Sequence, residues 1–153
     1  FKNLEIKMLK SFFHTGFVVV DIDKSISFYQ NVMGLQVVMQ DERSGEYAEK
    51  LLGFTGAHIK IAYLGIGDGH LLELIEYVVP RSNIPSINRN DLGASHICFI
   101  VEDIDSYYTN MSANGLRFIN PPSYLYDGDK VVRKTLYGQD LDNNWLEFVE
   151  ILS

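Results

Sequence analysis

The chain has 153 residues and a formal charge of −7, from 13 lysines and arginines against 20 aspartates and glutamates. This acidity, without any basic run, argues against nucleic-acid binding, because phosphate contacts need clustered cations. No apolar run approaches the ~18 residues that a membrane span needs, and the single cysteine, Cys98, excludes an intrachain disulfide. We therefore expect a cytoplasmic globular protein with one domain over residues 1–153.

The predicted elements, taken in chain order, form one series twice. The first series is strand 12–20, helix 23–33, strand 35–41, an undetermined stretch 44–53, strand 57–64 and strand 70–78. After a linker over 79–92 come strand 94–101, helix 103–114, strand 116–119, a loop at Pro121-Pro122, strand 131–138 and strand 144–151. This βαβββ order predicts an α+β fold with one module at about 12–78 and another at about 94–151.

A sequence repeat relates the two modules. Residues 14–23 match residues 96–105 at an offset of 82, and the strands that carry Glu73 and Glu147 match at an offset of 74. Asp21 and Asp103 precede the two helices at matching positions and are expected to be their N-caps. The chain therefore reads as two similar halves of a single domain.

Each half supplies one histidine near its start and one glutamate near its end. Strand alternation places these side chains, His14, Glu73, His96 and Glu147, among apolar neighbours, where a lone carboxylate is costly. If a pseudo-twofold axis relates the halves, all four can converge on one point. Two imidazoles and two carboxylates suit one divalent ion: zinc, nickel, cobalt, manganese or iron. Glu76 and Glu150 also match across the repeat, but they lie on the opposite faces and are expected to be solvent-facing or rim acids.

Four motifs resemble one known family. They are His14-x₆-Asp21-Ile22-Asp23, Leu72-Glu73-Leu74, His96-x₆-Asp103-Ile104-Asp105, and the run from Asp140 to Glu147. Over residues 12–151 the chain is similar to the vicinal oxygen chelate superfamily, which includes glyoxalase I, methylmalonyl-CoA epimerase, bleomycin resistance proteins and ring-cleaving dioxygenases. The resemblance implies paired βαβββ modules forming a curved, barrel-like mixed sheet with helices outside. It also implies a metal site and a homodimer, sometimes with modules exchanged between chains.

The ligand pattern His-Glu-His-Glu is similar to that of glyoxalase I. It implies a divalent-metal-dependent lyase or isomerase that moves a proton α to a carbonyl through a metal-bound enediolate. The catalytic base is expected to be Glu147, with Glu73 as its counterpart. The alternatives are an acyl-CoA epimerase, an iron-dependent dioxygenase, and a non-catalytic protein that binds an antibiotic or another small molecule.

The substrate is expected to be a small molecule. Bacterial glyoxalases hold glutathione with an arginine and an asparagine where this chain has Val18 and Tyr77, so the resemblance does not imply glutathione. Candidate substrate contacts are Tyr77, Cys98, Arg133 with its neighbour Lys134, and Tyr126, which lies with Tyr124 in the loop after Pro121-Pro122.

Overall fold

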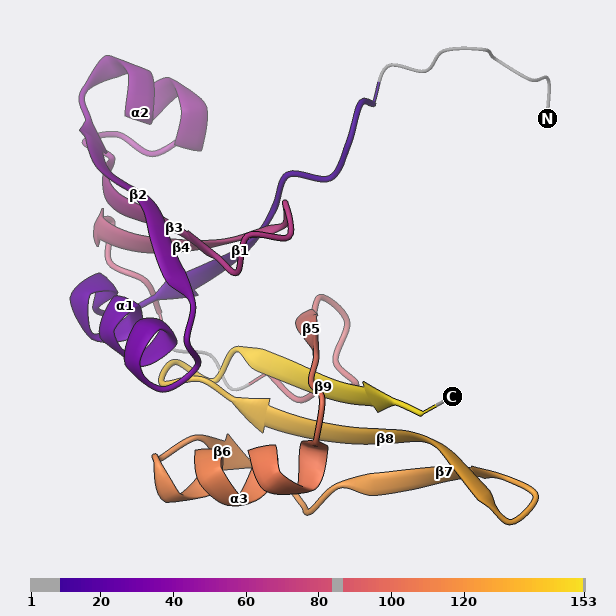
Figure 1. The fold of residues 1–153 in the computed structure, drawn as a ribbon. Helices are drawn as coiled ribbons and strands as arrows, with labels where there is room; N and C mark the ends of the chain where they lie inside the picture. Colours follow the sequence, from indigo (N-terminus) through magenta and orange to yellow (C-terminus); the bar gives the residue numbers. More distant parts are fainter. Residues whose placement is uncertain (1–8, 84–86, 153) are drawn as a thin grey trace, which may run out of the picture.

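The computed structural model describes residues 9–83 and 87–152. Module 1 contains β1 (His14–Val19), α1 (Ile22–Asn31), β2 (Gln36–Ser44), α2 (Glu46–Leu52), β3 (His58–Gly65) and β4 (Leu71–Val79). Module 2 contains β5 (His96–Ile100), α3 (Ile104–Ala113), β6 (Arg117–Phe118), β7 (Ser123–Asp127), β8 (Lys130–Gln139) and β9 (Trp145–Ile151). The predicted α+β architecture of paired modules is confirmed (Figure 1).

Each module forms its own mixed sheet. The strand orders are β1-β4-β3-β2 and β5-β9-β8-β6, with β7 paired to β8 as well. In both sheets the first strand of the module runs parallel to its last strand, and the other pairs are antiparallel. Within the described part of the chain the two sheets stay separate and do not close into one barrel (Figure 1).

Two stretches differ from the sequence prediction. The undetermined stretch 44–53 contains the short helix α2, which ends at Gly53 with a φ of 74°. The predicted loop after Pro121-Pro122 is strand β7, which turns through Gly128-Asp129 into β8. A two-residue turn with Gly at its first position is a common hairpin connection. All five residues of β7 are exposed, however, so the strand lacks the alternation of apolar and polar residues by which strands are recognised.

The two long helices begin as predicted. The side chain of Asp21 accepts a hydrogen bond from the backbone N–H of Lys24 at 3.1 Å, and Asp103 does the same for Ser106 at 3.1 Å. These contacts satisfy N–H groups that the helix itself leaves without partners. Among the described residues, no helix has the length and apolar character required to cross a membrane.

The carboxylates of Glu76 and Glu150 also cap these helices. The prediction of a solvent-facing or rim position is wrong for Glu150, which is buried, whereas Glu76 is half-buried. Glu76 accepts the backbone N–H of Ile22 at 3.0 Å, and Glu150 accepts that of Ile104 at 3.0 Å. Glu150 is only 7% exposed. A carboxylate at a helix start pairs with an orphan N–H group and with the positive end of the helix dipole. Their repeat-matched positions therefore reflect a structural role.

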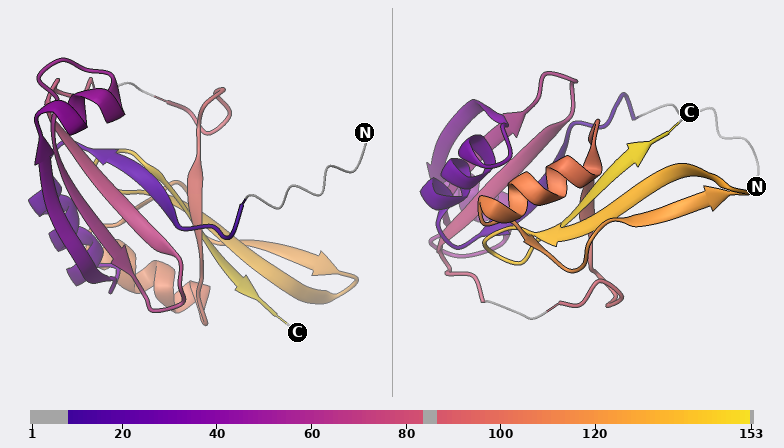
Figure 2. Two further views of the ribbon diagram at one scale, coloured as in Figure 1. Left: turned by 90° about the horizontal axis from the view of Figure 1, so that it is seen from above. Right: turned by 60° about the horizontal axis from the view of Figure 1, so that its bottom comes forward.

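A single hydrophobic core joins the two modules. Its buried residues from module 1 are Phe17, Val19, Ile22, Ile26, Phe28, Tyr29, Leu35, Ala62, Leu64, Leu72 and Leu74. Those from module 2 are Ile97, Ile104, Leu116, Leu136, Leu146 and Phe148. Helices α1 and α3 lie on the same side of the molecule, and both contribute to this core (Figure 2). The opposite faces of the two sheets are therefore left without cover from either helix.

The turn between β8 and β9 ties module 2 to module 1. Asp140 is 2% exposed and accepts hydrogen bonds from the hydroxyl of Tyr29 at 2.8 Å and from the backbone N–H groups of Asp142 and Asn144 at 2.9 and 2.8 Å. Burial raises the pKa of Asp140 above its usual value, although these donors act against the rise. Asn143 completes the turn with a φ of 70°, a conformation that asparagine tolerates better than most residues.

Replacing Tyr29 with phenylalanine should weaken the junction between the modules. The substitution removes one donor from the buried Asp140 carboxylate and should lower the free energy of unfolding by about 1–2 kcal/mol, measured by urea denaturation. Tyr107→Phe is the matched control, because the Tyr107 hydroxyl has no hydrogen-bond partner among the described residues and its ring packs on Phe148. Equal losses in the two variants would contradict this role for Tyr29.

Candidate metal centre

The first His–Glu pair lies on the uncovered face of module 1. Strands β1 and β4 are parallel neighbours with Gly16 opposite Glu73, so His14, one pleat away from Gly16, lies on the face of Glu73. His14 Nε2 is 3.2 Å from Glu73 Oε2. Glu73 is 8% exposed, and this contact helps to satisfy a carboxylate that would be costly to bury alone.

The second pair repeats this arrangement in module 2. Strands β5 and β9 are parallel neighbours with Cys98 opposite Glu147, and His96 lies one pleat away. His96 Nε2 is 3.0 Å from Glu147 Oε2. The sequence repeat therefore places the same two side chains in contact at the same point of each sheet.

The spacing within each pair fits two adjacent ligands of one metal ion. Nitrogen and oxygen ligands at about 2.0–2.2 Å from an ion lie about 2.9 Å apart at a right angle and about 3.4 Å apart at a tetrahedral angle. The observed distances of 3.2 and 3.0 Å fall in this interval. Imidazole nitrogen and carboxylate oxygen also suit zinc, nickel, cobalt, manganese and iron.

The two pairs do not meet within a single chain. Among residues 9–83 and 87–152, no third His, Cys, Asp or Glu joins either pair with all ligand atoms within 4.8 Å of one another. The chain therefore presents two candidate half-sites, His14–Glu73 and His96–Glu147, each with two side chains of a type that can bind a metal ion.

Each half-site has a tyrosine that the sequence reasoning missed. The hydroxyl of Tyr63 donates to Glu73 Oε1 at 2.6 Å, and Tyr63 and Tyr137 stand directly opposite Glu73 and Glu147 in the sheets. Burial, followed by the Glu73 contact, raises the pKa of Tyr63 to about 12, so this phenol remains a hydrogen-bond donor at neutral pH. The two tyrosines are separated by the same offset of 74 as the two glutamates, and this match was the available signal.

The half-sites differ at one repeat-matched position. Module 1 has Gly16, where an added Cβ would lie 3.3 Å from Glu73 Oε2. Module 2 has Cys98, which faces Glu147. Burial, followed by the charge of Glu147, raises the pKa of Cys98 to about 11, so the thiol is neutral at pH 7. Module 1 thus has no side chain at the position where module 2 places a thiol.

The remaining substrate candidates are dispersed. Tyr77 lies on the Glu73 face of β4, where its ring packs edge-on against Phe54 at 6.2 Å. Arg133 lies on the Glu147 face of β8, close enough for its charge to lower the pKa of Cys98 against the larger effect of burial. Tyr126 is exposed in strand β7 and not in a loop.

Asp103, Asp105 and Glu150 form an acidic cluster whose ligand atoms lie within 4.8 Å of one another. The ammonium group of Lys134 lies 2.7 Å from Asp105 and 3.2 Å from Glu150. Glu150 also caps Ile104. Lys134 thus offsets part of the charge of the three carboxylates, and Glu150 already has a structural role at the start of α3. Lys134 is correspondingly unavailable to a substrate.

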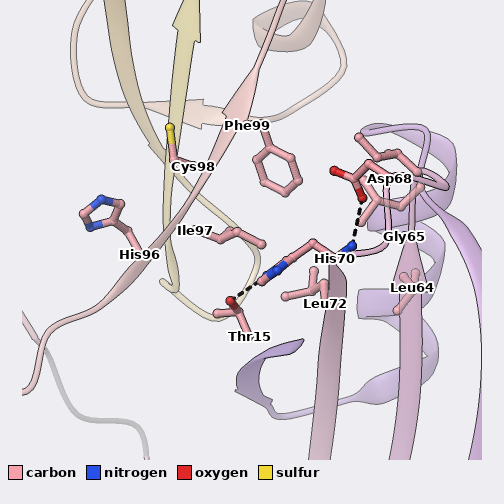
Figure 3. Close-up of a pocket in the computed structure, with 12 residues that line it drawn as sticks. Thr15, Leu64, Gly65, Asp68, His70, Leu72, His96, Ile97, Cys98 and Phe99 are labelled. Carbon is pink, nitrogen blue, oxygen red and sulfur yellow. Dashed lines mark hydrogen bonds between the residues drawn. The ribbon is translucent and has the colours of Figure 1, made fainter. Parts of the chain in front are cut away.

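A cavity of about 300 Å³ lies between the modules, and His96 and Cys98 of β5 are among its lining residues. Figure 3 shows Ile97 and Phe99 pointing into it, together with His70, whose Nε2 is 3.0 Å from the hydroxyl of Thr15. The side chains of His96 and Cys98 point to the other side of β5 (Figure 3). The cavity is therefore part of the seam between the modules.

Comparison with known proteins identifies relatives with several activities. A 2-epi-5-epi-valiolone epimerase from an Actinomyces species is 29% identical over 119 residues, which cover 75% of this chain and 65% of that protein. A lactoylglutathione lyase from Schizosaccharomyces pombe is 29% identical over 147 residues, covering 89% of this chain and 46% of that protein. A metallothiol transferase FosB from Staphylococcus haemolyticus is 27% identical over 142 residues, covering 92% and 83%. The chain thus spans less than two thirds of the length of the first two relatives.

Solved structures and a family model complete the comparison. A glyoxalase family protein from Bacillus cereus has the same fold, with a TM-score of 0.83 at 23% identity over 98% of this chain and 99% of that one. The model of the Glyoxalase/Bleomycin resistance protein/Dioxygenase superfamily matches residues 11–148. Since this match covers most of the chain, the protein belongs to the Glyoxalase/Bleomycin resistance protein/Dioxygenase superfamily.

Proposed function

We propose that the protein is a divalent-metal-dependent lyase or isomerase that transfers a proton α to a carbonyl, with His14, Glu73, His96 and Glu147 as metal ligands. The observation that carries this proposal is the repeated His–Glu contact at ligand spacing, 3.2 Å in one module and 3.0 Å in the other. The similarity to an epimerase and to a lactoylglutathione lyase supports this reaction class.

A bound metal ion would stabilise the negative charge that develops on the substrate oxygen as the proton leaves. The chain itself supplies the base. The side chain of Glu147 is 19% exposed, whereas that of Glu73 is 11% exposed and is held by the Tyr63 hydroxyl at 2.6 Å. Glu147 is thus the more accessible carboxylate, and we assign it the proton transfer, with Glu73 as its fixed counterpart.

The complete site needs a second copy of the chain. Each half-site provides only two ligands, and apolar side chains on the Glu147 face are uncovered: Ile100 is 76%, Ile151 60% and Leu125 56% exposed. Exposed apolar surface beside an incomplete site is typical of an interface. We infer a homodimer in which module 1 of one protomer faces module 2 of the other, so that two sites form across the interface.

Mixing two inactive variants tests this shared site. His14→Ala and His96→Ala each remove one ligand from every site. After subunit exchange, an equimolar mixture should regain about a quarter of the wild-type metal sites, because half of the dimers are mixed and each mixed dimer has one intact site. Metal content is measured after passage over a chelating resin.

The matched control is a mixture of His14→Ala with Glu73→Gln. Both changes damage the same half-site, so no combination restores a site and metal content should stay at the level of the single variants. If subunits exchange but the mixture of His14→Ala with His96→Ala regains no metal content, the whole site would lie within one chain.

Solvent exchange tests the reaction. Metal-loaded protein in D₂O should introduce deuterium α to the carbonyl of at least one compound among hemithioacetals, acyl-CoA epimers and α-hydroxy carbonyls. Glu147→Gln should lower this rate by about 10²–10⁴-fold, the usual contribution of a positioned base, while circular dichroism stays unchanged. Absence of exchange with all three classes would refute the proposal.

Two other observations would support the alternative functions. Oxygen uptake with bound iron would indicate a dioxygenase, and small-molecule binding that a chelator does not change would indicate a non-catalytic binding protein.

Tyr63→Phe should weaken metal binding without abolishing it. Groups that hydrogen-bond a metal ligand fix its orientation, and their removal typically costs about 10–100-fold in metal affinity. Competition with a chromophoric chelator measures the affinity, and the visible spectrum of the cobalt form reports the coordination. Tyr77→Phe is the control, because Tyr77 lies on the same face without a hydrogen bond to a ligand among the described residues. Equal affinities in the two variants would contradict the role of Tyr63.

A further inference from the structure

Arg89, in the linker between the modules, lies on an aromatic platform beside the His96–Glu147 half-site. Its guanidinium carbon is 4.7 Å from the centroid of the Tyr137 ring and 5.5 Å from that of Trp145. The Tyr137 ring in turn meets the His96 ring edge-on at 5.5 Å. Cation–π contacts of this kind attract a guanidinium to the face of an aromatic ring.

The segment that carries Arg89 is fixed to module 2. The indole N–H of Trp145 donates to the carbonyl of Ile87 at 3.2 Å. Asp91 closes the turn, accepting the backbone N–H of Asn88 at 2.7 Å, while its carbonyl accepts the N–H of Ala94 at 3.0 Å. The backbone is therefore held by hydrogen bonds both before and after Arg89, and none of these bonds involves the Arg89 side chain.

Among the residues that the structure describes, the N–H groups of the Arg89 guanidinium have no hydrogen-bond partner. In this acidic protein several other cations have an anionic or carbonyl partner: Arg43 bonds Asp41 at 2.8 Å, Lys134 bonds Asp105, and Arg117 donates to the carbonyl of Asp140. Within residues 9–83 and 87–152, Arg89 has no carboxylate within 4.0 Å and no hydrogen bond from its side chain. Because a cation–π contact uses no N–H donor, these donors can still bind an oxyanion, and a guanidinium can do so with two parallel hydrogen bonds.

These donors and a proposed metal ligand open onto the same small hollow. Its volume is about 150 Å³, and its lining residues are Arg89, Ala94, Ser95, His96, Tyr137 and Trp145. A small substrate at His96 could therefore place an attached negative group against Arg89.

We propose that Arg89 binds the anionic group of the substrate, so that the substrates of this site are small carbonyl compounds bearing a carboxylate or a phosphate. This inference rests on the proposed function for the identity of the reacting group, but the anion contact itself is a property of Arg89, Tyr137 and Trp145. The planar guanidinium, and not positive charge alone, provides the recognition.

The fluorescence of Trp145, the only tryptophan in the chain, reports directly on this contact. The metal-free protein is titrated with inorganic phosphate, with glycolate and with ethylene glycol as the neutral counterpart of glycolate. We expect saturable fluorescence changes with phosphate or glycolate and none with ethylene glycol. The anion that saturates at the lower concentration identifies the source of the negative group.

Substitutions test whether the anion-induced fluorescence change depends on Arg89. Arg89→Gln should weaken the anion response about tenfold or more, and Arg89→Lys should restore it only in part. Arg81→Gln, which removes the same charge from an exposed position in the same linker, should leave the response unchanged. An unchanged response in Arg89→Gln, or its loss in Arg133→Gln instead, would overturn the proposal.

The outcome is separable from that of the proposed function. Anion binding that needs Arg89, in a protein without solvent exchange on any substrate, would retain the anion site and refute the proton transfer. Solvent exchange on a carboxylate-bearing substrate with an unchanged KM in Arg89→Gln would retain the proton transfer and refute the anion site.

Discussion

The placement of two carboxylates in apolar strands, Glu73 buried and Glu147 half-buried, is the constraint on which the rest of the structure depends. An ionised carboxylate without a partner in such surroundings costs several kcal/mol. Glu73 is satisfied by His14 and Tyr63, and Glu147 by His96, through residues that the same repeat supplies. The parallel pairing of the first and last strands makes these contacts possible, because it brings the two ends of each module's sequence side by side.

The two faces of each sheet have different roles. The faces toward the helices are apolar and share one core, and their only buried acids, within the described residues, cap helices or close the turn at Asp140. The other faces carry the half-sites and uncovered apolar side chains. The core and the Asp140 turn fix how the modules of one chain are joined, and this leaves the half-sites available to a second copy.

Local patterns predicted much of this architecture. The repeat gave the modules, the N-caps at Asp21 and Asp103 and the strands bearing the His–Glu pairs, since periodicity and capping are encoded over a few residues. Strand β7 was not predicted, because all of its residues are exposed and it lacks the alternation of apolar and polar residues that marks a half-buried strand. The burial of Glu150 was not predicted, because strand alternation shows which face of the sheet a residue lies on but not that the start of a helix covers that face. Arg89 was missed because its aromatic partners, Tyr137 and Trp145, are far away in sequence and meet it only in the fold.

The central claim is that the two His–Glu pairs hold one shared cation, and the coordination of a bound metal tests it most directly. X-ray absorption spectroscopy of the zinc-loaded protein, together with anomalous diffraction from its crystals, should show one ion per chain bound by two imidazoles and two carboxylates. An ion bound by a single imidazole, or one located at Asp103, Asp105 and Glu150, would contradict the account.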